Sequence, residues 1–173
     1  MAGNSAYMVM VERWRRARSA YAGRERRPLG GYLASLVSYA VLVGAATVVG
    51  RRRGARLPDR SSPGDVVLLA VATHKAGRLL TKASVTSVLR APFTRFEGPA
   101  GHAEVNESPR HGGGRHAVGE LVTCPFCAGV WVAGALTTGR VFAPRATGLV
   151  TTALTAVAVS DWLHLAYDRV KNR

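Results

Sequence analysis

The chain has 173 residues, 47% of them hydrophobic, and 24 Lys and Arg residues against 10 Asp and Glu residues give it a formal net charge of +14. In a soluble protein such a charge would indicate a nucleic-acid partner, but here the apolar residues are gathered in long blocks. Basic residues that flank membrane spans on the cytoplasmic side produce the same excess, so we expect no nucleic-acid partner. The two cysteines lie in one C-x-x-C and exclude a disulfide framework.

The first expected element is a basic amphipathic helix over residues 5–21, which places Tyr7, Val11, Trp14 and Tyr21 near one face. Helices of this kind lie in the headgroup region of anionic membranes, so an anionic lipid bilayer is a predicted partner. The alternative is a charged helix that is merely solvated.

Three blocks predict membrane-spanning helices, because about 20 apolar residues are needed to cross the hydrocarbon core. Residues 28–50 hold 23 residues without a charge, residues 121–139 hold 19 and residues 146–160 hold 15, or 22 if the last block continues to residue 167. Residues 66–81 form a further apolar block that cations interrupt near its end. That block either spans the membrane or is re-entrant.

These blocks predict an all-α fold, a polytopic membrane helical bundle with three to four transmembrane helices and a cytoplasmic polar loop over residues 82–120. The basic linker from Arg51 to Pro63, which contains Pro58, marks a boundary. Residues 1–62 then comprise the basic N-terminal segment, the first span and the linker. Residues 63–173 form the membrane core.

Counts of Lys and Arg predict the orientation, because cytoplasmic segments of membrane proteins hold the excess of these residues. If residues 66–81 cross the membrane and the N-terminus is inside, the inner segments hold 15 of them (7 before the first span, 5 in the loop and 3 in the tail) against 7 outside. If that block is re-entrant and the N-terminus is outside, the counts are 15 and 9. Both arrangements place loop 82–120 and the C-terminus in the cytoplasm.

A set of ionisable residues in and beside the apolar blocks forms a candidate polar site. Helical spacing aligns His74 with Arg78, and Asp161 with His164, and an ionisable residue within a span commonly marks a functional site. The alternative is that these side chains reach the headgroups at the ends of their helices. The full candidate set is His74, Lys75, Arg78, Arg90, Arg95, Glu97, Asp161 and His164.

The thiols of Cys124 and Cys127 are a candidate redox or metal-binding pair. A helix that starts at Pro125 would place them at its N-terminus, where unpaired N–H groups favour the thiolate. His102, His111 and His116 would complete a zinc-ligand set, but their spacing fits no zinc finger or ribbon. No cofactor is indicated.

Three motifs stand in order along the second part of the chain. They are Ala72-Thr73-His74-Lys75 with Arg78-Leu79-Leu80-Thr81-Lys82, then Leu89-Arg90-Ala91-Pro92-Phe93-Thr94-Arg95, then Gly119-Glu120-Leu121 with Cys124-Pro125-Phe126-Cys127 and Trp131. Together they resemble the bacterial domain-of-unknown-function family 1360 (DUF1360), small multi-pass membrane proteins. The likeness covers about residues 64–170 and implies an integral protein of the bacterial cell (inner) membrane, with no assigned reaction. The loop histidines are not part of the family pattern, and the first 62 residues look like an addition to it.

Three functional hypotheses follow. The first is a non-enzymatic membrane component that binds a protein partner through loop 82–120. The second is a thiol-redox or metal-binding membrane protein that uses the two cysteines, although no βαβ pattern of a thioredoxin-like fold is present. The third is a lipid-phosphate enzyme that uses the cations of the polar site, with Glu97 or the Asp161/His164 pair as acid or base. The sequence completes no catalytic motif and leaves enzymatic activity open. Convergence of the polar candidates and the two thiols on one cavity would favour an enzyme or a ligand site, and dispersal would favour the first hypothesis.

Overall fold

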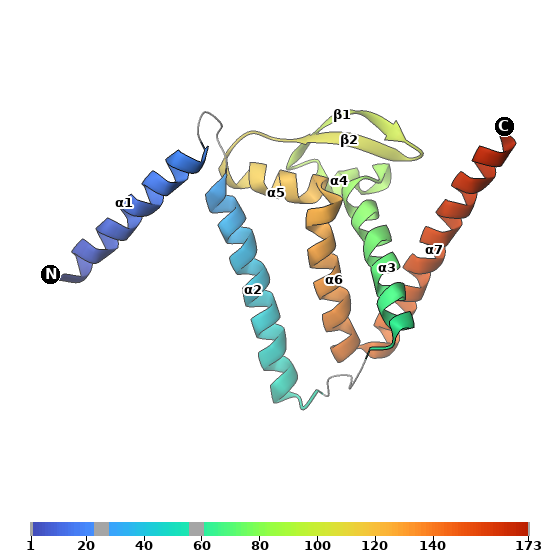
Figure 1. The fold of residues 1–173 in the computed structure, drawn as a ribbon, viewed down its shortest axis with the longest axis horizontal. Coiled ribbons are helices and arrows are strands. Elements are labelled where there is room, and N and C mark those ends of the chain that lie inside the picture. The colour runs from blue at the N-terminus through green and yellow to red at the C-terminus, as the bar shows by residue number, and fades with distance from the viewer. Residues whose placement is uncertain (1, 23–27, 56–60, 173) are drawn as a thin grey trace.

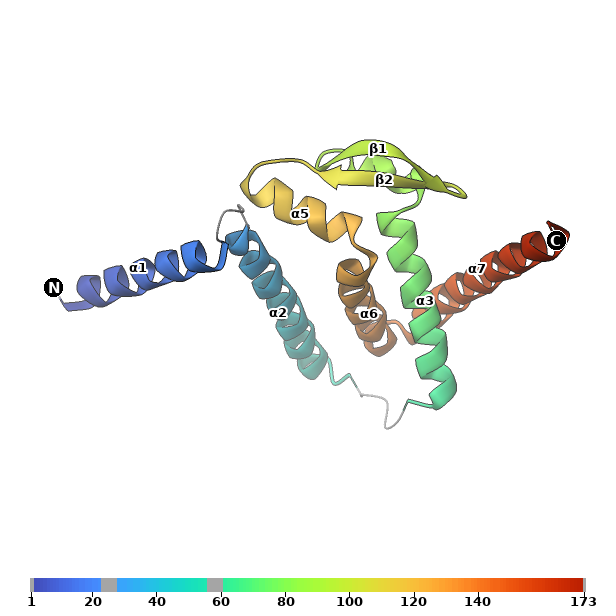
Figure 2. The same cartoon turned by 45° about the horizontal axis from the view of Figure 1, so that its top comes forward.

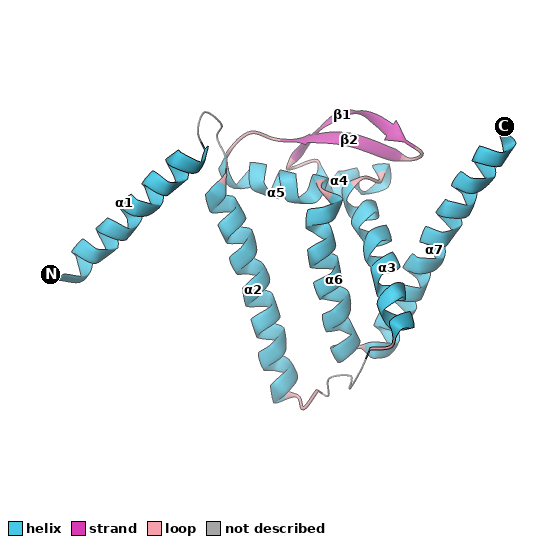
Figure 3. Ribbon diagram, viewed as in Figure 1, coloured by secondary structure: helices cyan, strands magenta, loops and turns pink. Residues whose placement is uncertain are grey.

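The computed structural model describes residues 2–22, 28–55 and 61–172, so residues 56–60 of the predicted linker lie outside the described part. The fold is mostly helical, which confirms the predicted class, with one small antiparallel sheet (Figure 3). In chain order the elements are α1 (Ala2–Ala22), α2 (Leu29–Arg52), α3 (Pro63–Thr81), the 3-10 helix η1 (Ser84–Thr86), α4 (Ser87–Arg90), β1 (Thr94–Gly101), β2 (Glu104–Pro109), α5 (Gly113–Thr123), α6 (Pro125–Phe142) and α7 (Pro144–Lys171).

Helices α2, α3, α6 and α7 run in alternating directions (Figures 1 and 2). One end of the molecule carries α5, β1 and β2, and we call it the hairpin end. α2 starts at the hairpin end and α3 returns to it. α6 leaves the hairpin end and α7 runs back toward it. The end of α2, the start of α3 and the turn between α6 and α7 lie at the opposite end, which we call the linker end.

Within the described residues, α2 and α7 are long and apolar enough to cross a membrane. α5 and α6 together would make a third span, bent by 80° at the break between them. α3 fails the same test because Asp65, Lys75 and Arg78 fall within its 19 residues. Length and composition therefore support two spans, or three if the bent pair counts as one.

The predicted apolar block 121–139 is not one continuous helix. α5 ends at Thr123, and Cys124 adopts an extended backbone with φ −102° and ψ 109°. Its Sγ accepts a hydrogen bond from the Cys127 N–H at 3.3 Å, which caps α6, and Pro125 occupies the first turn of that helix. The predicted helix start at Pro125 is confirmed, and the chain turns sharply just before it.

The expectation of a polar loop over residues 82–120 is wrong, because that stretch folds into η1, α4, a β-hairpin and α5. β1 and β2 pair antiparallel, with register shifts between Phe96 and Gly98 and between Pro99 and Gly101. A backbone hydrogen bond from Val105 N–H to Lys82 O at 2.9 Å ties β2 to the end of α3. The hairpin therefore continues the helical bundle as an ordered cap.

Helix α3 packs between α6 and α7 through small residues. Ala72 is fully buried, and a Cβ at Gly77 would lie 3.4 Å from the carbonyl oxygen of Pro125 on α6. α2 approaches α5 at Gly31, where an added Cβ would clash with the Cβ of Ala117. These close approaches fix where α2 and α3 sit against the other helices.

The N-terminal helix α1 confirms the helix predicted over residues 5–21, and it lies apart from the other helices (Figures 1 and 2). Its Tyr7, Trp14 and Tyr21 side chains are exposed, while Arg16 pairs with Glu12 at 3.2 Å. Binding of this helix to an anionic bilayer stays a prediction.

Candidate functional site

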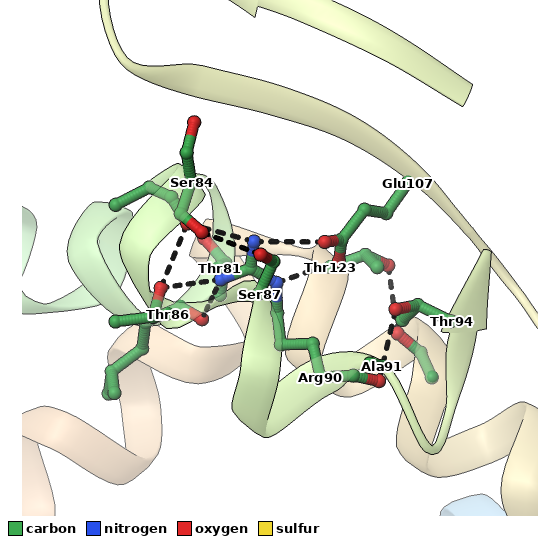
Figure 4. Close-up of polar contacts among 12 residues, drawn as sticks. Thr81, Ser84, Thr86, Ser87, Arg90, Ala91, Thr94, Glu107 and Thr123 are labelled. Carbon is green, nitrogen blue, oxygen red and sulfur yellow. Dashed lines mark hydrogen bonds and ion pairs between the residues drawn. The ribbon is translucent and has the colours of Figure 1, made fainter. Parts of the chain in front are cut away.

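Arg90 lies at the centre of a buried polar cluster at the hairpin end (Figure 4). Its Nε and Nη2 donate to the two carboxylate oxygens of Glu107 at 2.7 and 3.1 Å, and the two side chains are only 2% and 4% exposed. Nη1 donates to the Leu80 carbonyl at 2.8 Å and to Thr86 Oγ1 at 2.6 Å, and Nη2 donates to the Ala83 carbonyl at 3.0 Å. All N–H donors of the guanidinium are thereby satisfied within the protein.

Arg78 makes a second ion pair between α3 and the hairpin. Its Nε donates to Glu104 Oε1 at 2.9 Å, and its Nη2 contacts the other carboxylate oxygen. Glu104 also forms a β-bridge with Ala83, which follows α3. The backbone and the side chain of Glu104 therefore both join the start of β2 to the end of α3. Sequence reasoning left Glu104 and Glu107 out of the candidate site, yet these acids are the partners of two of its three arginines, Arg78 and Arg90.

Lys75 pairs with Asp161 across the contact between α3 and α7, where His74 lies beside Trp162. Lys75 Nζ lies 2.5 Å from Asp161 Oδ2, and the His74 ring lies 6.5 Å from the Trp162 ring, centroid to centroid. The Lys75 side chain is 15% exposed and that of Asp161 is 48% exposed, so the pair opens to one side. His164, predicted to share a face with Asp161, is exposed on α7.

Arg95 and Glu97 lie on the exposed surface of β1. Ser108 on β2 donates a hydrogen bond to Glu97 Oε1 across the hairpin. Seven of the eight candidate residues therefore fall in three separate places, which are the contact of α3 and α4 with β2, the α3–α7 interface and the outer surface of β1. The eighth, His164, lies apart from them on the exposed face of α7. The structure brings Lys75 and Asp161 together, but the candidate set as a whole does not converge on one cavity.

The thiols lie elsewhere again, at the break between α5 and α6. Both cysteines are free, with Cys124 half-buried and Cys127 exposed. Burial alone would raise the pKa of the Cys124 thiol, but the Cys127 side chain, the backbone N–H groups of Cys127 and Phe126, and the charge of Lys82 together lower that pKa below its usual value. Cys124 is therefore the more nucleophilic candidate of the pair.

Both thiols open into a groove between α2 on one side and α5 and α6 on the other, with a volume of about 670 Å³. Its lining is mainly apolar and aromatic, and Tyr39 and Trp131 meet edge to face with ring centroids 5.2 Å apart. At the end near the thiols, the Tyr32 hydroxyl donates to a carboxylate oxygen of Glu120. Sequence reasoning missed this groove, because α2 comes to it from a distant part of the chain.

The described residues hold no group of three or more His, Cys, Asp and Glu side chains that could bind a metal ion. The rings of His111 and His116 stack on each other, with centroids 6.2 Å apart, at the start of α5. His116 Nε2 also lies 3.5 Å from Glu120 Oε1. The zinc-ligand set considered from the sequence is therefore not assembled in the described part of the chain.

Comparison with protein families gives a match to the model of a protein of unknown function, DUF1360, over residues 68–167. The match covers more than half of the chain. The chain belongs to the DUF1360 family. The resemblance seen in the three sequence motifs is thereby confirmed.

The DUF1360 match takes in most of α3, the hairpin, α5, α6 and most of α7, with the ion pairs of Lys75, Arg78 and Arg90 and both thiols. Helices α1 and α2 lie outside it, so the groove is built from matched residues on one side and unmatched residues on the other. No curated protein and no solved structure gives a significant match to the chain. The family description itself assigns no activity.

Proposed function

We propose that the protein is a non-enzymatic, multi-pass membrane component that binds a protein partner through the β1–β2 hairpin on the cytoplasmic side. The dispersal of the candidate catalytic residues supports this proposal most strongly. Two of the three arginines expected to hold a lipid phosphate, Arg78 and Arg90, are engaged by Glu104 and Glu107, and the third, Arg95, lies apart on the surface of β1. An Arg90 whose donors are all satisfied has none left for a phosphate group.

In this proposal α3 crosses the membrane together with α2, α6 and α7. Its 19 residues are about 28 Å long at 1.5 Å per residue, close to the hydrocarbon thickness of about 30 Å. Lys75, the cation farthest from the hairpin end of α3, is paired with Asp161, which reduces the cost of placing it in the bilayer. Arg78 reaches the hairpin, where its partner Glu104 lies.

The orientation follows from the same arrangement. With four crossing helices, the N-terminal segment, the hairpin and the C-terminus share one side, and the α2–α3 link and the α6–α7 turn share the other. The side with the hairpin then holds 15 Lys and Arg residues against 7 on the opposite side, which favours the cytoplasm for the hairpin.

A photo-crosslinking residue at Phe96, whose side chain is 67% exposed on β1, is expected to capture a protein partner in intact cells. The matched control is the same residue at Val67, which is 61% exposed on α3 and faces lipid in this proposal. We expect a discrete protein adduct at Phe96 and none at Val67, read by gel mobility and mass spectrometry. Adducts of the same protein at both positions, or none at Phe96 with normal abundance, would contradict a partner site on the hairpin.

A second candidate function, a membrane thiol-redox protein, is favoured by the lowered pKa of Cys124 at the start of α6. Under this alternative the two thiols form a reversible disulfide in cells. Under the main proposal they stay reduced. Trapping the thiols with acid followed by alkylation distinguishes the two, since a substantial oxidised fraction would favour the redox function.

The reactivity of Cys124 is expected to depend on pH in a specific direction. Because the pKa of Cys124 lies below the usual thiol value, its thiolate persists to lower pH. In the Cys127→Ser variant the serine hydroxyl can still donate to Cys124 Sγ, so the alkylation midpoint should lie below that of an unstructured cysteine peptide. The control is Cys124→Ser. Its remaining thiol, that of Cys127, does not occupy the helix-capping position. A midpoint for Cys127→Ser at or above that of an unstructured cysteine peptide would show that Cys124 is not activated.

A further inference from the structure

The groove between α2, α5 and α6 has a polar end and an apolar end. At the polar end lie the Tyr32–Glu120 hydrogen bond and the two thiols. Toward the middle of the helices the lining is Leu36, Tyr39, Val130 and Trp131. A cavity of about 670 Å³ with this lining has the size and polarity of a site for a small amphiphile.

The surface around the groove indicates what fills it. α2 is one of the candidate spans, and Leu33, Leu36 and Val37 on it are 48%, 69% and 52% exposed. In a membrane these side chains contact lipid tails, and Leu36 belongs both to that lipid-facing surface and to the groove wall. The groove therefore continues the lipid-facing surface of α2, and a lipid tail can enter it from the side.

We propose that the groove binds one acyl chain of a bilayer phospholipid whose headgroup carries N–H donors, as phosphatidylethanolamine does, with that headgroup at Glu120. This proposal rests on the membrane placement proposed above. From Tyr32 to Tyr39 along α2 the groove is about 10 Å deep, which accommodates the upper part of a chain in a leaflet about 15 Å thick.

The headgroup preference follows from the carboxylate. Glu120 is the one charged side chain among the described residues that line the groove, and an ionised carboxylate only accepts hydrogen bonds. The ammonium of ethanolamine can donate a charge-assisted hydrogen bond to it, whereas the quaternary ammonium of choline has no N–H. Inside a bilayer an acyl chain that enters the groove leaves equally apolar lipid neighbours, so its only gain is in van der Waals packing. The headgroup contact therefore supplies the selectivity.

Trp131 lines the groove and can report occupancy, because brominated acyl chains quench tryptophan fluorescence on contact. The full chain is placed in phosphatidylcholine nanodiscs with increasing brominated phosphatidylethanolamine, in a Trp14→Phe, Trp162→Phe background. A Trp14→Phe, Trp131→Phe variant keeps Trp162, which is 49% exposed on α7, as a reporter of ordinary bilayer contact. Quenching of Trp131 is expected to saturate at a low lipid fraction and to exceed that of Trp162 several-fold.

Two variants of α2 test whether the groove is responsible. Ser35 lines the groove, whereas Ser38 is exposed and its hydroxyl only donates to the Ala34 carbonyl of its own helix. Ser35→Phe is expected to remove the saturable quenching of Trp131, and Ser38→Phe to retain it. Brominated phosphatidylcholine in the same series is expected to quench several-fold less than the ethanolamine lipid.

The outcomes separate this inference from the function proposed above. One contrary outcome is that Trp131 and Trp162 are quenched to the same extent, linearly with lipid fraction and equally for both headgroups. This result would overturn the groove site while supporting membrane insertion. Equal quenching of Trp131 in Ser35→Phe and Ser38→Phe would also overturn it, provided that Trp162 shows both variants to be inserted. If neither Trp131 nor Trp162 is quenched, both the groove site and the membrane placement are overturned.

Discussion

Replacement of Arg90 by methionine is expected to lower the free energy of unfolding by about 3 to 5 kcal/mol, because it leaves Glu107 as a buried carboxylate without its partner. The Glu107 side chain is only 4% exposed, so water cannot solvate the charge without local opening. The same change removes the contacts of Arg90 with the Leu80 and Ala83 carbonyls at the end of α3. Thermal unfolding in detergent and protein abundance in the membrane measure the effect.

Arg95→Met is the matched control, because Arg95 is exposed and nearby on β1, and its effect should stay within about 0.5 kcal/mol. The double variant Arg90→Met, Glu107→Leu removes both charges and is expected to recover part of the loss. Equal stability of Arg90→Met and Arg95→Met would show that the ion pair does not hold the hairpin to α3.

Gly119→Ala is expected to destabilise the protein by about 1 to 3 kcal/mol through overpacking. A Cβ at Gly119 would lie 2.7 Å from the Phe93 carbonyl oxygen and 2.9 Å from Pro109 Cβ. Both neighbours are part of the backbone or of a rigid ring, so α5 must move away from the hairpin to admit the methyl group. The loss is measured as a lower unfolding temperature and faster proteolysis between β2 and α5.

Gly114→Ala on the same helix is the comparison for this effect. A Cβ at Gly114 would meet nothing within 4 Å, and alanine restricts the unfolded chain, so this variant should be neutral or stabilising by up to about 1 kcal/mol. If the two substitutions shift the unfolding temperature equally, the close packing of α5 on the hairpin is contradicted.

Much of the helical arrangement could be predicted from local signals. The charge-free block from residue 28 to 50 corresponds to α2, and the helix start at Pro125 follows from the capping Cys124 and a proline in the first turn. Such features depend on residues adjacent in the chain, where periodicity and capping preferences apply directly.

The hairpin could not be predicted in the same way. β1 contains Gly98 and Pro99, and register shifts at both ends of this pair break the alternation of polar and apolar side chains that identifies a strand. Without the hairpin, the partners of Arg78 and Arg90 could not be identified, and both arginines resembled free cations. Likewise, the groove depends on α2 meeting α5 and α6, which no local pattern encodes.

In the proposed topology α3 crosses the membrane and places the hairpin in the cytoplasm. The direct measurement is labelling by an impermeant maleimide in a background of Cys124→Ser and Cys127→Ser, with one cysteine added at Ser61 before α3 or at Ser108 on β2. In intact cells we expect Ser61→Cys to react and Ser108→Cys to react only after permeabilisation. Equal labelling of the two in intact cells, or labelling of Ser108→Cys alone, would contradict the account.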